Sequence, residues 1–447
     1  MPNTFAYGAL LIWPLVTFAI FAILRPNQAV IWSLLAGYLF LPVKTSFDFP
    51  GVPALDKTSI VNLSTFLAAI LYTGPRAVRA PQEWWINVLM IGYVASPILT
   101  IFGNSDALIY GDLLIPGLKL YDAFSSGAYK AIDLLPLLIG YNLLRTPKGQ
   151  HEILRAIVIA SLGYSLLMLV EIRLSPQLHR WIYGFFPHSF DQQMRGDGFR
   201  PVVFLGHGLL VAIFAAISIA AAAYLARMRV RLFGISSWWW LAYLLIVLML
   251  CKSLGALILA VAAAGMTLFM NRKLIRIICA SAALIVLTYP ALRGSDSIPV
   301  QPIADYVAHY SEERAASFQT RIDNEDQLLA RANQRPWFGW GGYGRNRVFN
   351  EETGKDISIT DGMWIIIVGT YGWIGYIFTF GLLCIPIIIS SAKKFNYLAN
   401  SGFVDMLLVI NLFDILLNSS LSPLTWLMAG SAVPFIHSAR LKRGSFG

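Results

Sequence analysis

Long apolar stretches constrain this chain most, because they recur along nearly its whole length. A stretch of about 18 or more apolar residues can cross a bilayer as a helix. Hydrophobic residues make up 57% of the sequence, and the mean hydropathy is +0.63. We therefore expect a polytopic membrane protein. The expected spans, about 13 in all, are 6–24, 28–43, 59–74, 85–103, 131–145, 153–172, 202–225, 238–251, 254–270, 275–292, 362–390, 403–418 and 424–438.

These stretches predict an all-α integral membrane protein, a bundle of about 12–14 transmembrane helices. Residues 1–292 hold about ten spans, with outer loops at 104–130 and 173–201. Residues 293–361 form one large, partly helical loop, and 362–447 hold the last spans and a tail. The first apolar segment lacks a basic start and an A-x-A cleavage pattern, so we keep it as a span.

Basic residues in the short connections predict the orientation. Such connections lie at 75–81, 145–149, 226–232, 271–276 and 392–395, and the tail at 439–444 resembles them. Short basic loops stay in the cytoplasm, so the long loops, 293–361 among them, are expected on the opposite face. The C-terminus is then inside, and an odd number of spans puts the N-terminus outside. The basic connections account for about half of the lysines and arginines behind the net charge of +10, the other half need another reason, and no nucleic-acid partner is expected.

The sequence offers no pattern for a metal or a cofactor. Cys251, Cys279 and Cys384 lie in or beside apolar stretches, where they pack as small apolar residues and predict neither disulfides nor a zinc site. The outer loops have no Asp-x-Asp pair, and RIDNEDQ (321–327) is expected to be the solvated face of a helix. The short cytoplasmic loops leave no room for a nucleotide-binding domain.

Arginines gather in two outer loops, where the positive-inside rule does not require them. The candidates are Arg195, Arg200, Arg314, Arg321 and Arg345, with His207 in the apolar segment after the first loop. One interpretation is solvated loop charges, partly offset by nearby carboxylates. The other is a diphosphate site, because guanidinium groups bind phosphate oxygens bidentately and lysine cannot.

The segment 304–336 has no internal glycine and reaches a proline only at its end, which predicts a helix. Arg314 and Arg321 then lie two turns apart on nearly the same face. The next stretch, RPWFGWGGYGRNR (335–347), combines glycines that permit positive φ with aromatic residues suited to a membrane interface. It is not a Walker A sequence. We expect a rigid turn that braces the arginine-bearing helix at the membrane surface.

The order of these motifs resembles the O-antigen ligase and O-antigen polymerase superfamily of bacterial membrane glycosyltransferases. The matching features are the proline and glycine block 336–344, the pair Asp361-Gly362 that opens a helix, and Gly372-Trp373-Ile374-Gly375. The stretch GFRPVVFLGHG (198–208) looks like the arginine-led entry into the middle span. These motifs cover about a quarter of the chain, and the rest matches in hydropathy and loop sizes alone.

Two departures from the family pattern favour one branch. Ligases that transfer a finished glycan to lipid A core usually carry histidine where this sequence has Asp361, so the chain looks more like the polymerases. A common Ser-Arg-Gly turn is replaced by Lys252-Ser253-Leu254-Gly255, which puts the role of its cation in doubt. The resemblance therefore implies polymerisation of repeat units carried on polyprenyl (undecaprenyl) diphosphate, with ligase-type transfer as the alternative.

The chemistry of such a donor assigns roles to the candidates. A diphosphate is already a good leaving group, so the protein must stabilise its charge and remove a proton from the acceptor hydroxyl. We expect Asp361 to act as the base, Arg321 as a catalytic cation, and His207 as a hydrogen-bonding residue or an acid or base. The expected diphosphate and sugar ligands are Arg195, Arg200, Arg314, Arg345 and Lys252. Alternatively, Asp361 is only a helix N-cap and His207 only a packing residue.

The resemblance also implies a setting. The protein would lie in a bacterial inner membrane with its active site facing the periplasm, and would make O-antigen, capsule or exopolysaccharide. Its partners would be the lipid-linked oligosaccharide, the bilayer, a chain-length regulator and other polysaccharide assembly proteins. A different class stays open, because Asp405, Asn411 and Asp414 lie in one late span. Polar residues inside spans are typical of transporters and lipid flippases.

Overall fold

The computed structural model describes residues 1–49, 52–195, 198–295, 302, 308–309, 312–392 and 402–434, and within these the side chains of 312–315 and 317–318 are not described. The helices are α1 (Thr4–Ile23), α2 (Pro26–Phe40), α3 (Lys57–Thr73), α4 (Trp84–Ile101), α5 (Leu120–Asp133), α6 (Leu135–Ile139), α7 (Pro147–Leu174), α8 (Leu178–Tyr183), α9 (Gly208–Arg227), α10 (Ser237–Leu250), α11 (Leu254–Phe269), α12 (Arg272–Gly294), α14 (Glu312–Asn333), α15 (Met363–Ser390), α16 (Phe403–Leu417) and α17 (Pro423–Ala432).

The remaining elements are short. The strands are β1 (Ser46–Phe47), β2 (Leu55–Asp56), β3 (Leu108–Tyr110), β4 (Leu113–Ile115), β5 (Met194–Arg195), β6 (Gly198–Phe199), β7 (Arg231–Leu232) and β8 (Ile235–Ser236), paired antiparallel as four two-stranded hairpins. Two 3₁₀ turns, η1 (Gly74–Val78) and η3 (Asp191–Gln193), and a π-helical turn, η2 (Gly140–Leu144), complete them. The protein is therefore a helical bundle with small hairpins between helices.

Six helices in the described part of the chain are long and apolar enough to span a membrane: α1, α4, α7, α9, α12 and α15. The shorter apolar helices include α10 and α11. The six candidates and the surrounding helical bundle confirm an all-α membrane protein. Each of the thirteen expected spans overlaps at least one helix, but how many of them cross remains a prediction.

Two expected spans differ from the helices that form. The expected span 131–145 is divided among the end of α5, α6 and η2, and α5 begins already at Leu120, where Asp122 accepts from the Lys119 N–H at 2.7 Å. The span expected from 202 begins as α9 only at Gly208. The N–H groups of residues 202 and 203 both donate to Glu171 of α7 at 2.7 Å. The backbone there therefore forms a loop instead of the first turn of the helix.

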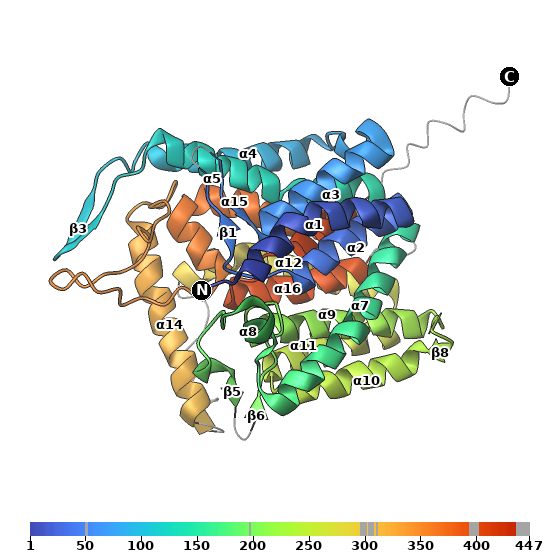
Figure 1. Cartoon of the computed structure of the whole chain (residues 1–447). Coiled ribbons are helices and arrows are strands. Elements are labelled where there is room, and N and C mark those ends of the chain that lie inside the picture. Colours follow the sequence, from blue (N-terminus) through green and yellow to red (C-terminus); the bar gives the residue numbers. More distant parts are fainter. Residues whose placement is uncertain are drawn as a thin grey trace.

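The helix α9 lies at the centre of the bundle, packed against α7, α10, α11 and α16. Its alanine-rich sequence lets neighbouring backbones approach closely. Figure 1 shows α14 crossing one end of the bundle, on the same side as β3, α8 and β5, while β8 lies at the opposite end. We call the first end the α14 face. It carries the candidate site.

Candidate functional site at the α14 face

Contacts with two neighbouring elements hold α14 in place. Arg293, at the end of α12, forms an ion pair with Asp326 of α14 at 2.5 Å. The N–H of Ile359 donates to the Asn324 side chain of α14 at 2.9 Å, so the segment that precedes α15 lies against this helix. These contacts bring Arg321 next to the start of α15.

Arg321 and Asp361 form an ion pair in which the Arg321 Nε lies 3.7 Å from the Asp361 Oδ2. Both side chains are accessible, with exposed fractions of 42% and 46%. The N-cap of α15 is Gly362, with no side-chain capping bond. Asp361 is therefore not the N-cap of α15. Its carboxylate stays available to a ligand at this face.

The β5–β6 hairpin positions two more arginines. Arg195 pairs with Gly198 across the hairpin, and the Arg200 N–H donates to the Gln193 carbonyl at 2.8 Å. The side chain of Gln193 in turn accepts from the N–H of Gly208 at 3.1 Å. The hairpin is thereby tied to the first residue of α9.

Lys252 joins these arginines from the turn between α10 and α11, where its φ is +52°. Its Nζ donates to the Arg195 carbonyl at 2.9 Å, and the guanidinium of Arg200 donates to the Lys252 carbonyl at 3.2 and 3.3 Å. Burial, together with the guanidinium groups of Arg195 and Arg321, lowers the pKa of Arg200 to about 10. We call Arg195, Arg200, Lys252 and Arg321 the cationic cluster. Among the described residues, Asp361 is the one carboxylate that forms an ion pair with any of the four.

His207 precedes α9 at the edge of this cluster. Its Nδ1 accepts from the Leu209 N–H at 3.1 Å, so the neutral ring carries its proton on Nε2. Burial, together with the neighbouring imidazole and guanidinium groups, lowers the pKa of His207 to about 4. At neutral pH His207 therefore offers an Nε2–H donor and no basic nitrogen. This geometry favours the hydrogen-bonding role expected for it over the acid or base role.

Sequence reasoning did not single out His188 and Lys44, which border the same place. The rings of His188 and His207 lie 4.7 Å apart, and Nδ1 of His188 accepts from the Ser189 N–H at 2.8 Å. Its Nε2 then also carries a proton. Burial lowers the pKa of His188, and Lys44 nearby lowers it further. Both residues lie in irregular segments, where residue type was the only available signal.

The block 335–347 docks on an interruption in α15. Gly372 has φ +68° and ψ −172°, which breaks the helix. The backbone groups freed by this break pair with the block. The Gly369 and Thr370 carbonyls accept hydrogen bonds from backbone N–H groups of the block at 2.8 and 2.9 Å, and the Trp373 N–H donates to the Pro336 carbonyl at 2.8 Å. A Cβ at Gly372 would lie 2.3 Å from the carbonyl of Trp337. Irregular backbone at membrane depth is tolerated where protein buries it, and this block supplies that cover.

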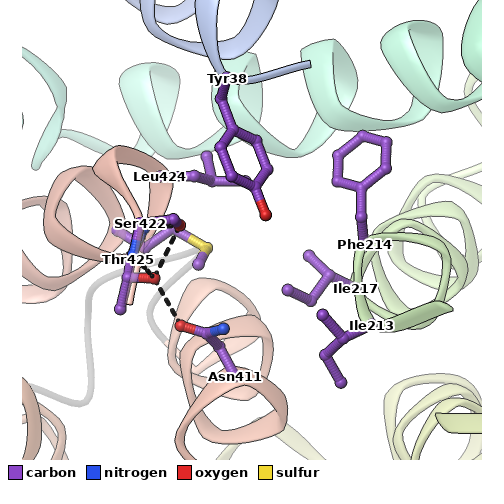
Figure 2. A pocket seen from close by; sticks show the side chains of 9 residues that line it. Tyr38, Ile213, Phe214, Ile217, Asn411, Ser422, Leu424 and Thr425 are labelled. Atoms are coloured by element: carbon purple, nitrogen blue, oxygen red, sulfur yellow. Dashed lines mark hydrogen bonds between the residues drawn. The ribbon is translucent and has the colours of Figure 1, made fainter. Parts of the chain in front are cut away.

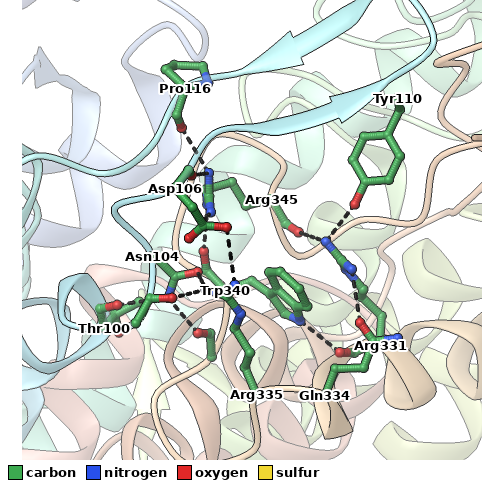
Figure 3. Close-up of polar contacts among 12 residues, drawn as sticks. Thr100, Asn104, Asp106, Tyr110, Pro116, Arg331, Gln334, Arg335, Trp340 and Arg345 are labelled. Carbon is green, nitrogen blue, oxygen red and sulfur yellow. Dashed lines mark hydrogen bonds and ion pairs between the residues drawn. The ribbon is translucent and has the colours of Figure 1, made fainter.

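An aromatic ring, backbone carbonyls and polar side chains hold Arg335 and Arg345 of the block, and Arg331 at the end of α14 (Figure 3). The guanidinium carbons of Arg331 and Arg335 lie 3.3 and 4.1 Å from the ring centroid of Trp340. Arg331 donates to the Tyr110 hydroxyl at 2.7 Å, and Arg335 to the Asn104 side chain at 2.7 Å. The block is therefore anchored to the end of α4 and to the β3–β4 hairpin.

Arg345 lies in this scaffold and not in the cationic cluster. Its side chain is fully buried, and it donates to the carbonyls of Trp340, Asp106 and Pro116 at 3.1, 2.9 and 3.0 Å (Figure 3). Full burial leaves the Arg345 side chain no accessible surface for a ligand, so its expected role as a substrate ligand finds no support in this geometry. Arg314 is in α14, but its side chain lies outside the described residues.

Lys130 is a further residue that sequence reasoning missed. It is buried, donates to the Ser96 hydroxyl at 2.7 Å, and lies 3.4 and 4.6 Å from the ring centroids of Tyr371 and Tyr93. Tyr371 immediately precedes Gly372, so this cation contacts the break in α15 from the side of α5. A lysine near the end of an amphipathic helix gave no sign of burial.

The polar residues of α16 that suggested a transport path each accept a hydrogen bond from a nearby side chain. Asp405 accepts from Ser390 at 2.7 Å, and Asn411 accepts from Thr425 at 2.6 Å beside a pocket of about 10 Å³ (Figure 2). Asp414 accepts a hydrogen bond from the Asn418 side chain at 2.7 Å. A pocket of this size has room for about one water molecule.

Among the residues that the structure describes, no three histidine, cysteine, aspartate or glutamate side chains gather as a metal site would need. Comparisons with protein-family models and with curated proteins find no match to this chain. The likeness to the O-antigen ligase and polymerase superfamily therefore stays a resemblance of motifs.

Proposed function

We propose that the protein is a membrane glycosyltransferase whose donor is an oligosaccharide linked to a polyprenyl diphosphate. The observation that carries this proposal is the exposed Arg321–Asp361 ion pair at the edge of the cationic cluster. Four segments far apart in the sequence supply the cluster and the carboxylate. A site with several cations and one carboxylate suits a diphosphate donor and a hydroxyl acceptor.

The diphosphate is the part of the donor that the cluster would bind. Arg195 and Lys252 are exposed, and guanidinium groups form charge-assisted bonds to phosphate oxygens. His207 adds a neutral N–H donor beside the cations. Donors fixed before the reaction stabilise the negative charge that grows on the leaving diphosphate.

The transfer would then proceed without a protein-bound intermediate. Asp361 accepts the proton of the acceptor hydroxyl, and that oxygen forms a bond to the anomeric carbon. The bond from the anomeric carbon to the diphosphate oxygen breaks, and the polyprenyl diphosphate leaves with the electron pair. Arg321 lies between the carboxylate and the other cations, so it would orient the base and bind the leaving group at once.

The resemblance favours a polymerase in the bacterial inner membrane, with its active site on the periplasmic side and repeat units as both donor and acceptor. Asp361 in the place of the ligase histidine supports that branch. Transfer of a finished glycan to a lipid A core is the alternative. The product of the reaction distinguishes the two.

The test is transfer by purified protein in nanodiscs, supplied with a polyprenyl diphosphate-linked repeat unit, without nucleotide and with EDTA. We expect a ladder of products that differ by one repeat. Arg321→Ala removes a donor to the developing charge and should lower the rate by about 10²–10³-fold. Asp361→Asn removes the base and should lower it by about 10²–10⁴-fold.

The ion pair of Arg347 with Asp356 supplies the matched control, because it lies between the same two residue types at 2.5 Å and is also partly exposed. Arg347→Ala should leave the ladder unchanged. A single transfer onto lipid A core would identify a ligase. No transfer with the correct substrate, together with flipping of the lipid or uptake of a solute, would contradict the enzyme proposal.

A further inference from the structure

A pocket of about 150 Å³ lies between the N-terminal halves of α2 and α7. Its lining includes Gln28, Ile31 and Trp32 from α2 and Glu152, Arg155 and Ile159 from α7. Pockets for drug-sized ligands are larger, about 300–1,000 Å³. This pocket therefore suits a small polar group with apolar surface beside it.

The pocket lies at the end of the bundle opposite the α14 face. Phe40 ends α2, its ring lies 5.8 Å from that of Tyr164, and its carbonyl accepts from Tyr183 of α8 at 2.6 Å. Phe40 and Tyr164 are each about 12 residues beyond Gln28 and Glu152, so α2 and α7 run parallel. Because α8 belongs to the α14 face, the N-terminal ends of both helices reach the other end.

Two opposite charges line the pocket without pairing. The Oε2 of Glu152 is buried and accepts no hydrogen bond from the described residues. Arg155 is exposed and lies on the same face of α7, one turn further on. No ion pair joins the two in the described structure. A carboxylate oxygen shielded from solvent favours a ligand that donates hydrogen bonds to it.

The surroundings favour a lipid as that ligand. α7 is long and apolar enough to span a membrane. Trp32 is partly buried at the pocket, and tryptophan is enriched where a bilayer meets water. Ile31 and Ile159 add apolar surface beside the charges. A molecule that reaches this place from the bilayer presents its phosphate and headgroup amine together.

We propose that this pocket binds the headgroup of a phospholipid with a primary ammonium group, of the phosphatidylethanolamine type. The Glu152 carboxylate accepts from the ammonium, and the Arg155 guanidinium binds the phosphate. A choline headgroup has the same phosphate, but its nitrogen carries only methyl groups and cannot donate to Glu152. The site should therefore prefer ethanolamine lipid to choline lipid.

The test is competition between phosphatidylethanolamine and phosphatidylcholine of the same acyl chains for delipidated full-length protein. Native mass spectrometry measures how much of each lipid stays bound to the protein. We expect about a fivefold preference for the ethanolamine lipid, from the hydrogen bonds to the carboxylate. Glu152→Gln should bring that ratio to about one. Arg155→Gln should weaken retention of both lipids, because both carry the phosphate.

Glu351→Gln, at an exposed carboxylate in another loop, should keep the fivefold ratio. Equal thermal unfolding of all variants in choline lipid rules out misfolding as the cause. An equal ratio in the wild type, or an unchanged ratio in Glu152→Gln, would overturn the proposal. Displacement of the lipid by inorganic phosphate alone would identify a simple anion site. Because the readout is lipid retention, failure here leaves the transfer reaction of the α14 face unaffected.

Discussion

Two groups of arginines lie at the α14 face, and they differ in what surrounds them. Arg331, Arg335 and Arg345 are held by the ring of Trp340, by backbone carbonyls and by polar side chains. The arginines of the cationic cluster have few protein acceptors and one carboxylate among the described residues. The first group is held mainly by groups of the protein, whereas the second has more donors available to a ligand.

The difference shows that acceptors decide what a loop arginine does. A guanidinium has five N–H donors in a fixed plane. Arg345 donates to three carbonyls at full burial and so holds a loop together. Arg321 is partly exposed, and the carboxylate that it pairs with among the described residues lies 3.7 Å away. An arginine whose donors the protein leaves free is a candidate for phosphate.

The largest expected effect comes from replacing one arginine of each group by methionine. Arg345→Met removes a fully buried guanidinium and leaves three carbonyls without this donor, and it should cost about 3–5 kcal/mol of unfolding free energy. Arg321→Met breaks a partly exposed pair and should cost less than about 1 kcal/mol. Denaturant unfolding in detergent, followed by tryptophan fluorescence, measures both. Equal losses would show that the two groups do not differ as described.

A second prediction tests whether the glycine-rich block is rigid scaffold. Gly372→Ala forces a side chain into a backbone region that glycine alone adopts freely, and against the Trp337 carbonyl. We expect a loss of about 3 kcal/mol. Gly342→Ala is the control, because nothing lies within 4 Å of its added Cβ, and it should change stability by less than about 0.5 kcal/mol. Similar losses at both positions would contradict the docking of the block on α15.

The smallest effect is a pH dependence within the cationic cluster. The pKa of His207 is lowered to about 4 in the folded protein, and its usual value is about 6.5. The unfolded chain therefore takes up the proton first as pH falls, and stability is lost between about pH 6.5 and pH 4. His207→Gln does not titrate. Between pH 7 and 4.5 the wild type should lose about 1 kcal/mol more than the variant, allowing for solvent screening.

Thermal unfolding of both proteins at the two pH values measures this difference. An equal loss of stability would show that His207 is not held neutral by burial and the neighbouring cations. In that case the acid or base role expected from the sequence would return, because a charged imidazole can give up a proton.

Hydropathy predicted much of the fold, because a membrane span is a local property of about 20 residues. The expected span 153–172 lies inside α7, and the expected span 362–390 matches α15 within a residue. The start at 202 was wrong because Glu171, distant in sequence, takes the backbone N–H groups there. Hydropathy cannot register a partner that comes from another helix.

The candidate site was predicted less completely. Arg321 and Asp361 were expected at one site, and the structure places them together, but their roles remain proposals. In the sequence, Arg345 could not be told from the other loop arginines. Its burial depends on carbonyls from residues 106 and 116, which no local sequence pattern reveals. His188 and Lys44 were missed for the same reason, since only the folded loops bring them to His207.

The break in α15 also sets an order of events during synthesis. The ribosome makes the block 335–347 before it makes α15. The donors and acceptors that the interrupted helix needs therefore already exist when the helix leaves the protein-conducting channel. In a chain in which the block followed the helix, backbone amide groups would lie in lipid without hydrogen-bond partners until the block was synthesised. The direction of translation thus protects a span whose backbone is incomplete on its own.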